Sequence, residues 1–145
     1  MNRDLMIVGF GIKSISAERK NVPRGRIDIN SAPKIVSVSW PGVKVFTKKK
    51  PVNIKFEFTT KYEPNIAEIK ISGHVLYLGK KTKELIKKWK KSKVFPREVD
   101  MEVKNFLFRK CLTLGVNLSE NMQLPPPLIF PRVVQKKKAD LRYIG

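Results

Sequence analysis

Residues 95–134 read FPREVDMEVKNFLFRKCLTLGVNLSENMQLPPPLIFPRVV and hold the longest helical pattern of the chain. Pro96 has the fixed φ that suits a first helical turn, and acidic residues follow it where the helix dipole favours negative charge. Apolar residues then recur at helical spacing, which predicts a long helix over the Met101–Met122 region. The three prolines at 125–127 cannot continue a helix and predict an extended segment after it.

Two apolar stripes run along this predicted helix. The first holds Val103, Phe106, Leu107, Cys111, Leu114 and Leu118. The second holds Phe108, Leu112, Gly115 and Val116. A helix with one stripe covers a sheet, whereas two stripes favour two neighbours, one of them a second subunit. We therefore expect a homo-oligomer, a dimer or tetramer, with Phe108, Leu112 and Val116 at its interface; burial of the helix in one monomeric core is the alternative.

Before residue 78 the apolar residues alternate with period two, which is typical of strands with one buried face. We expect strands at 5–17, 35–45, 52–58 and 67–78, with a loop at 18–33. A short helix is expected over 80–93. Strands followed by helices predict an α+β fold: a four-stranded antiparallel sheet with a short and a long helix packed on one face.

The 145 residues and 16.7 kDa correspond to a single domain, 1–145, with a basic tail at 135–145 that we expect to be mobile. No apolar run approaches the roughly 20 residues of a membrane-spanning helix. The single cysteine, Cys111, lies in an apolar helical face and cannot form an internal disulfide. This favours a reducing compartment, and we expect the protein to be cytoplasmic.

The formal net charge is +19, from 31 basic and 12 acidic residues. Such a surface attracts polyanions such as RNA, although lysine-rich solubility is the simpler interpretation. The candidate polyanion-binding residues are Arg19, Lys20, Arg24, Arg26, Lys48, Lys49, Lys50, Lys87, Lys88, Lys90 and Lys91.

Few residues offer catalytic chemistry. His74 is the only histidine and Cys111 the only cysteine, so a zinc cluster of these residue types cannot be assembled. A phosphate-binding glycine loop is absent from the sequence. We therefore expect no enzyme activity, no metal and no cofactor. Around His74–Leu78 the apolar residues fall on both faces, which indicates either a strand covered on both faces or an exposed apolar surface.

Two stretches near the end of the chain, Arg109-Lys110-Cys111-Leu112 and the proline segment Leu124–Val133, resemble the SecB family of export chaperones. The step Arg109-Lys110-Cys111-Leu112 is similar to that family's Arg-x-Cys-hydrophobic step on its helix. The segment Leu124–Val133 is similar to the proline-containing segment that follows it. The order of elements over Ile35–Val133 fits the family, and residues 1–34 match it only loosely.

The resemblance implies an ATP-independent holdase that binds unfolded or non-native polypeptides in apolar grooves, in protein export or with another client set. The expected groove residues are Val75, Tyr77, Trp89, Phe95 and Phe106. The family is acidic where it meets the SecA motor, whereas this chain is strongly basic. The alternative function is therefore that of a basic ribosome- or RNA-associated binding protein.

Overall fold

The computed structural model describes residues 7–41, 51–79, 82–129 and 131–135. Its elements are β1 (Ile7–Arg19), β2 (Asp28–Ser39), β3 (Val52–Glu63), β4 (Ala67–Tyr77), α1 (Thr82–Ser92) and α2 (Arg97–Asn121). The four strands form one antiparallel sheet in the order β1-β4-β3-β2. The sheet and the two helices confirm the fold class expected from the sequence.

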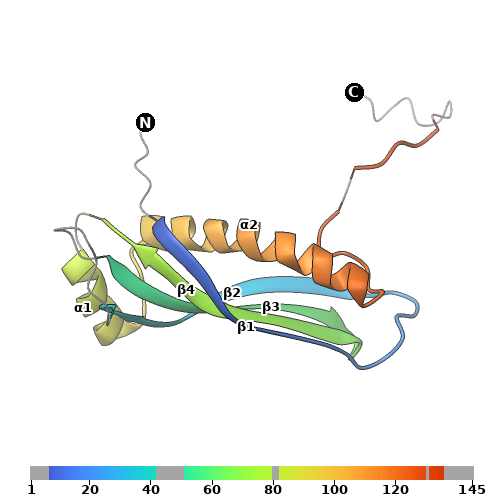
Figure 1. The fold of residues 1–145 in the computed structure, drawn as a ribbon, viewed down its shortest axis with the longest axis horizontal. Helices are drawn as coiled ribbons and strands as arrows, with labels where there is room; N and C mark the ends of the chain where they lie inside the picture. The colour runs from blue at the N-terminus through green and yellow to red at the C-terminus, as the bar shows by residue number, and fades with distance from the viewer. Residues whose placement is uncertain (1–6, 42–50, 80–81, 130, 136–145) are drawn as a thin grey trace.

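The helix α2 runs along one face of the sheet, and α1 lies at the end of the sheet where β2 finishes (Figure 1). The long helix contacts β2, β3 and β4, and the short helix contacts β2. Both helices bury apolar side chains in the same core as the central strands. The edge strands β1 and β2 each have one neighbour in the sheet.

The central strands alternate without interruption between a buried and a more exposed face. On β3 the buried set runs from Val52 to Tyr62 in steps of two, and on β4 it runs from Ala67 to Tyr77. The pairing of Val52 with Tyr77 and of Phe58 with Ile71 places these sets on the same face. This face meets α2, and the opposite face carries mainly polar residues such as Lys55 and Lys70.

The helix α2 places its residues in ridges spaced by four. The buried ridge is Val103, Leu107, Cys111, Gly115 and Ser119. Half-buried residues flank it on both sides. The sequence pattern assigned Gly115 to the second stripe, but the structure places it on the buried ridge, where Pro127 packs 3.5 Å from the position of an added Cβ. Residues four apart lie on nearly the same side of a helix, and each such row turns slowly around the helix axis. The residues of the two predicted stripes therefore form three rows in the structure, the buried ridge and one half-buried row on each side of it.

Three bulges shape the edge strands. The pairing register shifts around Val8 and Lys13 on β1 and around Val36 on β2. Each bulge adds one residue that opposes no partner, so the inward-facing parity of the strand changes. On β1 the inward residues are therefore even-numbered between the two bulges and odd-numbered after Lys13, as the pairing of Ile12 with Gly73 and Ile15 with Ile71 shows.

Several boundaries differ from the sequence prediction. The strands β1 and β3 continue to Arg19 and Glu63, beyond their expected ends at 17 and 58. The strand β2 begins at Asp28, inside the stretch expected to be a loop, because residues 28–33 pair with the far half of β3. Pro33 is compatible with this pairing because β2 is an edge strand. The long helix begins at Arg97 rather than near Met101, with Pro96 at its N-cap instead of its first turn. The continuation of the second strand toward residue 45 lies outside the described residues.

The proline segment after α2 returns to the sheet. Gln123 has a φ of 57°, and the Leu124 amide donates to the Ser119 carbonyl at 2.9 Å, which ends the helix. The Tyr62 hydroxyl then donates to the Pro125 carbonyl oxygen at 2.6 Å. Burial raises the pKa of Tyr62, and a side-chain hydrogen bond with Ser119 partly offsets the effect. The segment is therefore held against β3 by a buried tyrosine.

Candidate polypeptide-binding surface

An apolar band lies between β1 and α2. Phe10 forms its base, because its ring stacks on Phe56 at 5.9 Å between centroids and meets Phe106 edge-on at 5.4 Å. Beyond Phe10, the inward residues Ile12 and Ile15 remain 40% and 46% exposed. They face the helix side of the sheet but lie on the edge strand, beside the part that α2 covers. We call this surface the β1-side band.

The flank of α2 toward β1 continues this band. Phe106, Leu114 and Leu118 are half-buried, packed against the core, and spaced so that they share one side of the helix. Lys110 lies on the same side with its ammonium 5.7 Å from the centre of the Phe106 ring, and the Arg109 guanidinium lies 5.6 Å from it. The β1-side band therefore combines accessible apolar area with cations at one point of its rim.

The expected groove residues are mostly covered in the structure. Val75, Tyr77, Trp89 and Phe95 are all buried, and only Phe106 is half-buried and borders the β1-side band. Trp89 and Phe95 pack against each other at 5.3 Å between ring centroids, which joins α1 to the connection before α2. A role for these four residues in client binding stays a prediction. In the structure these four side chains pack in the core and are not accessible to a client.

Tyr77 joins the end of β4 to the first turns of α2. Burial, followed by the negative charge of Glu102, a hydrogen bond to it, and the charge of Glu98, raises the pKa of Tyr77 to about 12. The neutral hydroxyl is therefore the donor and the Glu102 carboxylate the acceptor at neutral pH.

The residues expected at an oligomer interface lie together on the other flank of α2. Phe108, Leu112 and Val116 are all half-buried. Phe108 meets Phe58 edge-on at 5.5 Å between ring centroids, so part of its surface already serves the monomer core. Val116 is not among the residues packed against that core. The structure brings the three residues onto one surface, and their contact with a second subunit stays a prediction.

Cys111 lies fully buried in the middle of α2. Desolvation raises the pKa of its thiol to about 12, so the thiolate that nucleophilic or redox chemistry needs is strongly disfavoured at neutral pH. The residue serves packing in this fold.

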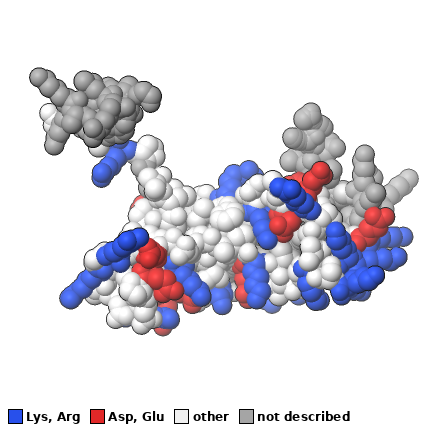
Figure 2. All heavy atoms as spheres, turned by 180° about the vertical axis from the view of Figure 1, so that it is seen from behind, with Lys and Arg blue, Asp and Glu red and all other residues white. Residues whose placement is uncertain are grey.

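Basic side chains gather at both ends of the sheet (Figure 2). Arg19, Lys20, Arg24 and Arg26 are exposed at or after the end of β1, where Glu18, Asp28, Glu63 and Glu68 also lie. Arg26 pairs there with Asp28 at 3.6 Å. Lys87, Lys88, Lys90 and Lys91 are exposed on α1, where Glu84 is the only acid. Lys48, Lys49 and Lys50 lie outside the described residues.

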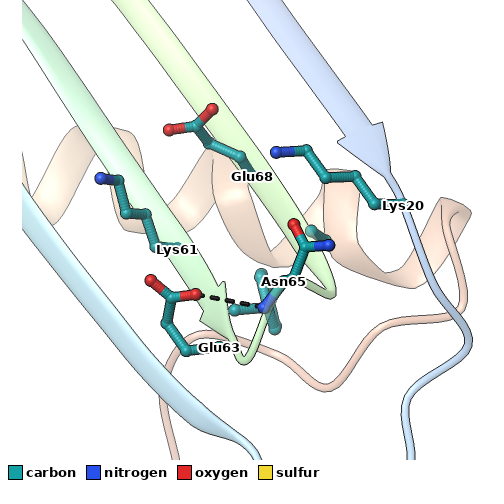
Figure 3. A pocket seen from close by; sticks show the side chains of 7 residues that line it. Lys20, Lys61, Glu63, Asn65 and Glu68 are labelled. Atoms are coloured by element: carbon teal, nitrogen blue, oxygen red, sulfur yellow. Dashed lines mark hydrogen bonds between the residues drawn. The ribbon is translucent and has the colours of Figure 1, made fainter.

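A small cavity of about 130 Å³ lies at the turn between β3 and β4 (Figure 3). Its charged lining residues are Lys20, Lys61, Glu63 and Glu68, two of each sign. The Glu63 carboxylate accepts a hydrogen bond from the Asn65 amide at 3.2 Å, and the Lys20 amide donates to the Ile66 carbonyl at 2.7 Å. These contacts join the end of β1 to the turn between β3 and β4. The positive and negative side chains of the cavity balance, so we assign the cavity a structural role at this end of the sheet.

Within the described ranges, no group of three or more His, Cys, Asp or Glu residues lies close enough to hold a metal ion. Among the helices that the structure describes, none is both long and apolar enough to span a membrane.

Comparison with known proteins shows a likeness in fold. Neither a family model nor a curated protein sequence matches the chain. Among solved structures, the fold is similar to the SecB-like chaperone Rv1957 of Mycobacterium tuberculosis, solved in complex with a peptide from the HigA1 antitoxin. The likeness has a TM-score of 0.52 and 9% sequence identity, and covers 88% of each chain. The chain therefore has a SecB-like fold, which confirms the resemblance seen in its helix and proline segment.

Proposed function

We propose that this protein is an ATP-independent holdase that binds apolar segments of unfolded polypeptides on the β1-side band. The observation that carries the proposal is the exposure of Ile12 and Ile15 on the helix side of an open edge strand, beside the half-buried Phe106. The SecB-like fold supports it, because a protein of similar fold binds a peptide. The expected cytoplasmic location is where such clients are synthesised.

Two kinds of contact are open to a client on this surface. Apolar side chains of the client would bury area against Ile12, Ile15 and Phe106, at about 25 cal/mol per Å² of apolar area, whatever their sequence. Among the described residues β1 pairs only with β4, so its outer edge offers backbone donors and acceptors to an extended segment, as in strand addition. Both contacts need an extended, unfolded client, and neither needs a nucleotide.

Assembly would strengthen such binding. We propose a dimer or tetramer that uses Phe108, Leu112 and Val116, which lie on the α2 flank opposite the β1-side band. The two surfaces then do not compete for the same residues. Several copies of a weak apolar site in one assembly can engage one long client together, which raises the overall affinity without any new contact.

A peptide-binding measurement tests the proposed surface. A fluorescent peptide that alternates apolar and polar residues is titrated with the protein and with Ile12→Ser/Ile15→Ser. Each isoleucine is about half exposed before binding, so its loss should cost about 1 kcal/mol, and the double variant should bind about 30-fold more weakly.

The matched control is Val22→Ser/Val94→Ser, which removes two exposed apolar side chains from the β1–β2 loop and the α1–α2 connection. This control should bind the peptide as the unaltered protein does. Equal loss in both double variants would contradict the proposed location of the site.

A further inference from the structure

The outer face of α1 carries a ridge of lysines that the fold does not explain. Lys83, Lys87, Lys90 and Lys91 lie on one side of the helix and are all exposed. The apolar residues Leu85, Ile86 and Trp89 are buried on the other side. At 1.5 Å per residue the ridge is about 12 Å long.

Helix stability gives a reason for only part of this ridge. Lys90 and Lys91 stand in the last turn, where the helix dipole favours cations. Lys83 stands in the first turn, where the dipole disfavours them. Lys87 is three or four residues from each of the other three, and like-charge pairs at these spacings destabilise a helix. Charge that opposes the stability of its own element is better explained by a ligand that neutralises it.

This ridge is also poorly balanced by acids. In the part of the chain that the structure describes, the ion pairs are Arg26–Asp28 and Lys104–Asp100, and neither involves α1. At the opposite end of the sheet, the exposed bases stand among four acids. The helix α1 itself carries one acid, Glu84, and the further acids at its end of the sheet, Glu98, Asp100 and Glu102, lie on the first turns of α2. The sequence does not show which of the two basic clusters is the better candidate for binding a polyanion. The structure favours the cluster on α1, because this cluster shares its helix with a single acid.

An exposed aromatic ring lies at the same end of the sheet. Trp40 directly follows β2, the strand that α1 contacts, and its side chain is 38% exposed. Cations that track a phosphate backbone together with an exposed aromatic ring are the combination that single-stranded nucleic acids bind, because a base can stack on the ring. The ridge holds none of the Arg, Asn or Gln residues with which recognition helices read base edges in duplex DNA.

We propose that the lysine ridge of α1 and Trp40 form a binding site for single-stranded RNA. The lysines contact phosphates without reading sequence, and the indole stacks on one base. A membrane surface fits less well, because α1 has its apolar face buried in the protein and cannot insert it between lipids. The site shares no residue with the β1-side band, so a chain bound there and RNA bound here do not exclude each other.

The test compares two variants with the same change in charge. A labelled oligouridine of about 20 nucleotides is titrated by fluorescence anisotropy at several salt concentrations. Lys83→Gln/Lys87→Gln/Lys90→Gln/Lys91→Gln should lower the affinity at low salt at least tenfold. It should also reduce the slope of log affinity against log salt by about 3, since each contact with a single strand contributes about 0.7. The control Arg19→Gln/Lys20→Gln/Arg24→Gln/Arg26→Gln should keep most of the affinity and slope.

Two further measurements complete the test. Trp40→Ala should weaken RNA binding about tenfold, and the Trp fluorescence quenched by RNA in the unaltered protein should not be quenched in this variant. If the fourfold α1 variant melts earlier than the unaltered protein, the single variant Lys87→Glu at the centre of the ridge replaces it and should still weaken binding.

Equal losses in the two fourfold variants, unaltered affinity in the α1 variant, or stronger binding to phosphatidylserine vesicles or duplex DNA than to RNA would overturn the proposal. Peptide binding at the β1-side band should be unchanged in the α1 variant. Failure of the RNA site is therefore distinguishable from failure of the holdase function.

Discussion

Replacement of Gly73 by alanine tests how β1 is attached to the sheet, and therefore how the β1-side band is formed. Gly73 lies on the helix-facing side of β4, opposite Ile12 on β1. A Cβ at Gly73 would overlap the carbonyl oxygen of Gly11 and lie 2.9 Å from the Cα of Ile12. Both neighbours are backbone atoms of the adjacent strand, so no side-chain rotation can relieve the overlap.

The cost follows from this geometry. To reach ordinary van der Waals contact, β1 must move away from β4 near its second bulge, which weakens the hydrogen bonds of that ladder. Overpacking of a well-packed site costs typically 1–3 kcal/mol and occasionally more, and a clash with backbone belongs at the upper end, at about 3 kcal/mol. For a chain of this size the melting temperature should fall by roughly 10 °C.

Urea unfolding followed by circular dichroism measures this loss, and Gly11→Ala is the matched control. A Cβ at Gly11 would lie 2.7 Å from Cε1 of His74, but this imidazole is exposed and can rotate away. The control should lose less than about 1 kcal/mol. If Gly73→Ala is as stable as Gly11→Ala, β1 does not pack against β4 as described here.

Three other changes have defined outcomes. Burial raises the pKa of Cys111 from 9.0 to about 12, so between these pH values the folded state keeps a proton that the unfolded chain loses. The free energy of unfolding should therefore fall by about 1.4 kcal/mol per pH unit as the pH rises through this range. Urea titrations at pH 8 and 10 measure this fall, which should be less steep in Cys111→Ala. Tyr62→Phe leaves the Pro125 carbonyl without its donor and should lower the free energy of unfolding by about 1–2 kcal/mol, whereas an unchanged urea midpoint would contradict the anchoring of the proline segment. Leu112→Lys should shift a dimer or tetramer toward monomer in light scattering at micromolar concentration, and a monomeric unaltered protein would refute the oligomer.

The types of the secondary-structure elements could be predicted well, because burial of one face gives apolar residues a period of two in a strand and of 3.6 in a helix. The alternation in β3 and the helical spacing in α2 both come from one buried face, which any single sequence displays. The start of β2 was missed because an edge strand buries less of each face. Its first residues are polar and include Pro33, so they resemble a loop until their pairing with β3 is known.

The candidate site was harder to predict because it depends on strand pairing. The consecutive apolar run Val75–Leu78 made the end of β4 look apolar on both faces, and this ambiguity placed Val75 and Tyr77 among the expected groove residues. In the structure β4 alternates throughout, and Leu76 and His74 lie over Gly9 and Gly11 of β1 on the outer face. The two glycines leave room for these side chains, a relation that no local pattern reveals.

The β1-side band was also hard to predict, because it depends on which strand α2 leaves uncovered, and the sequence does not show this. Ile12 and Ile15 belong to a pattern typical of a strand with one buried face, and the position of β1 at the sheet edge leaves them exposed. Phe106 belongs to the first predicted stripe of the long helix, and the structure places it half-buried beside Phe10, at the edge of this band.

Suppression of aggregation tests the holdase function most directly. A chemically unfolded client protein is diluted into buffer with and without a few-fold excess of this protein, without nucleotide, at low and at high salt, and light scattering is followed. We predict that scattering is suppressed at both salt concentrations, because apolar burial persists where exposed charges are screened. Unaffected aggregation, or suppression that disappears at high salt, would contradict it.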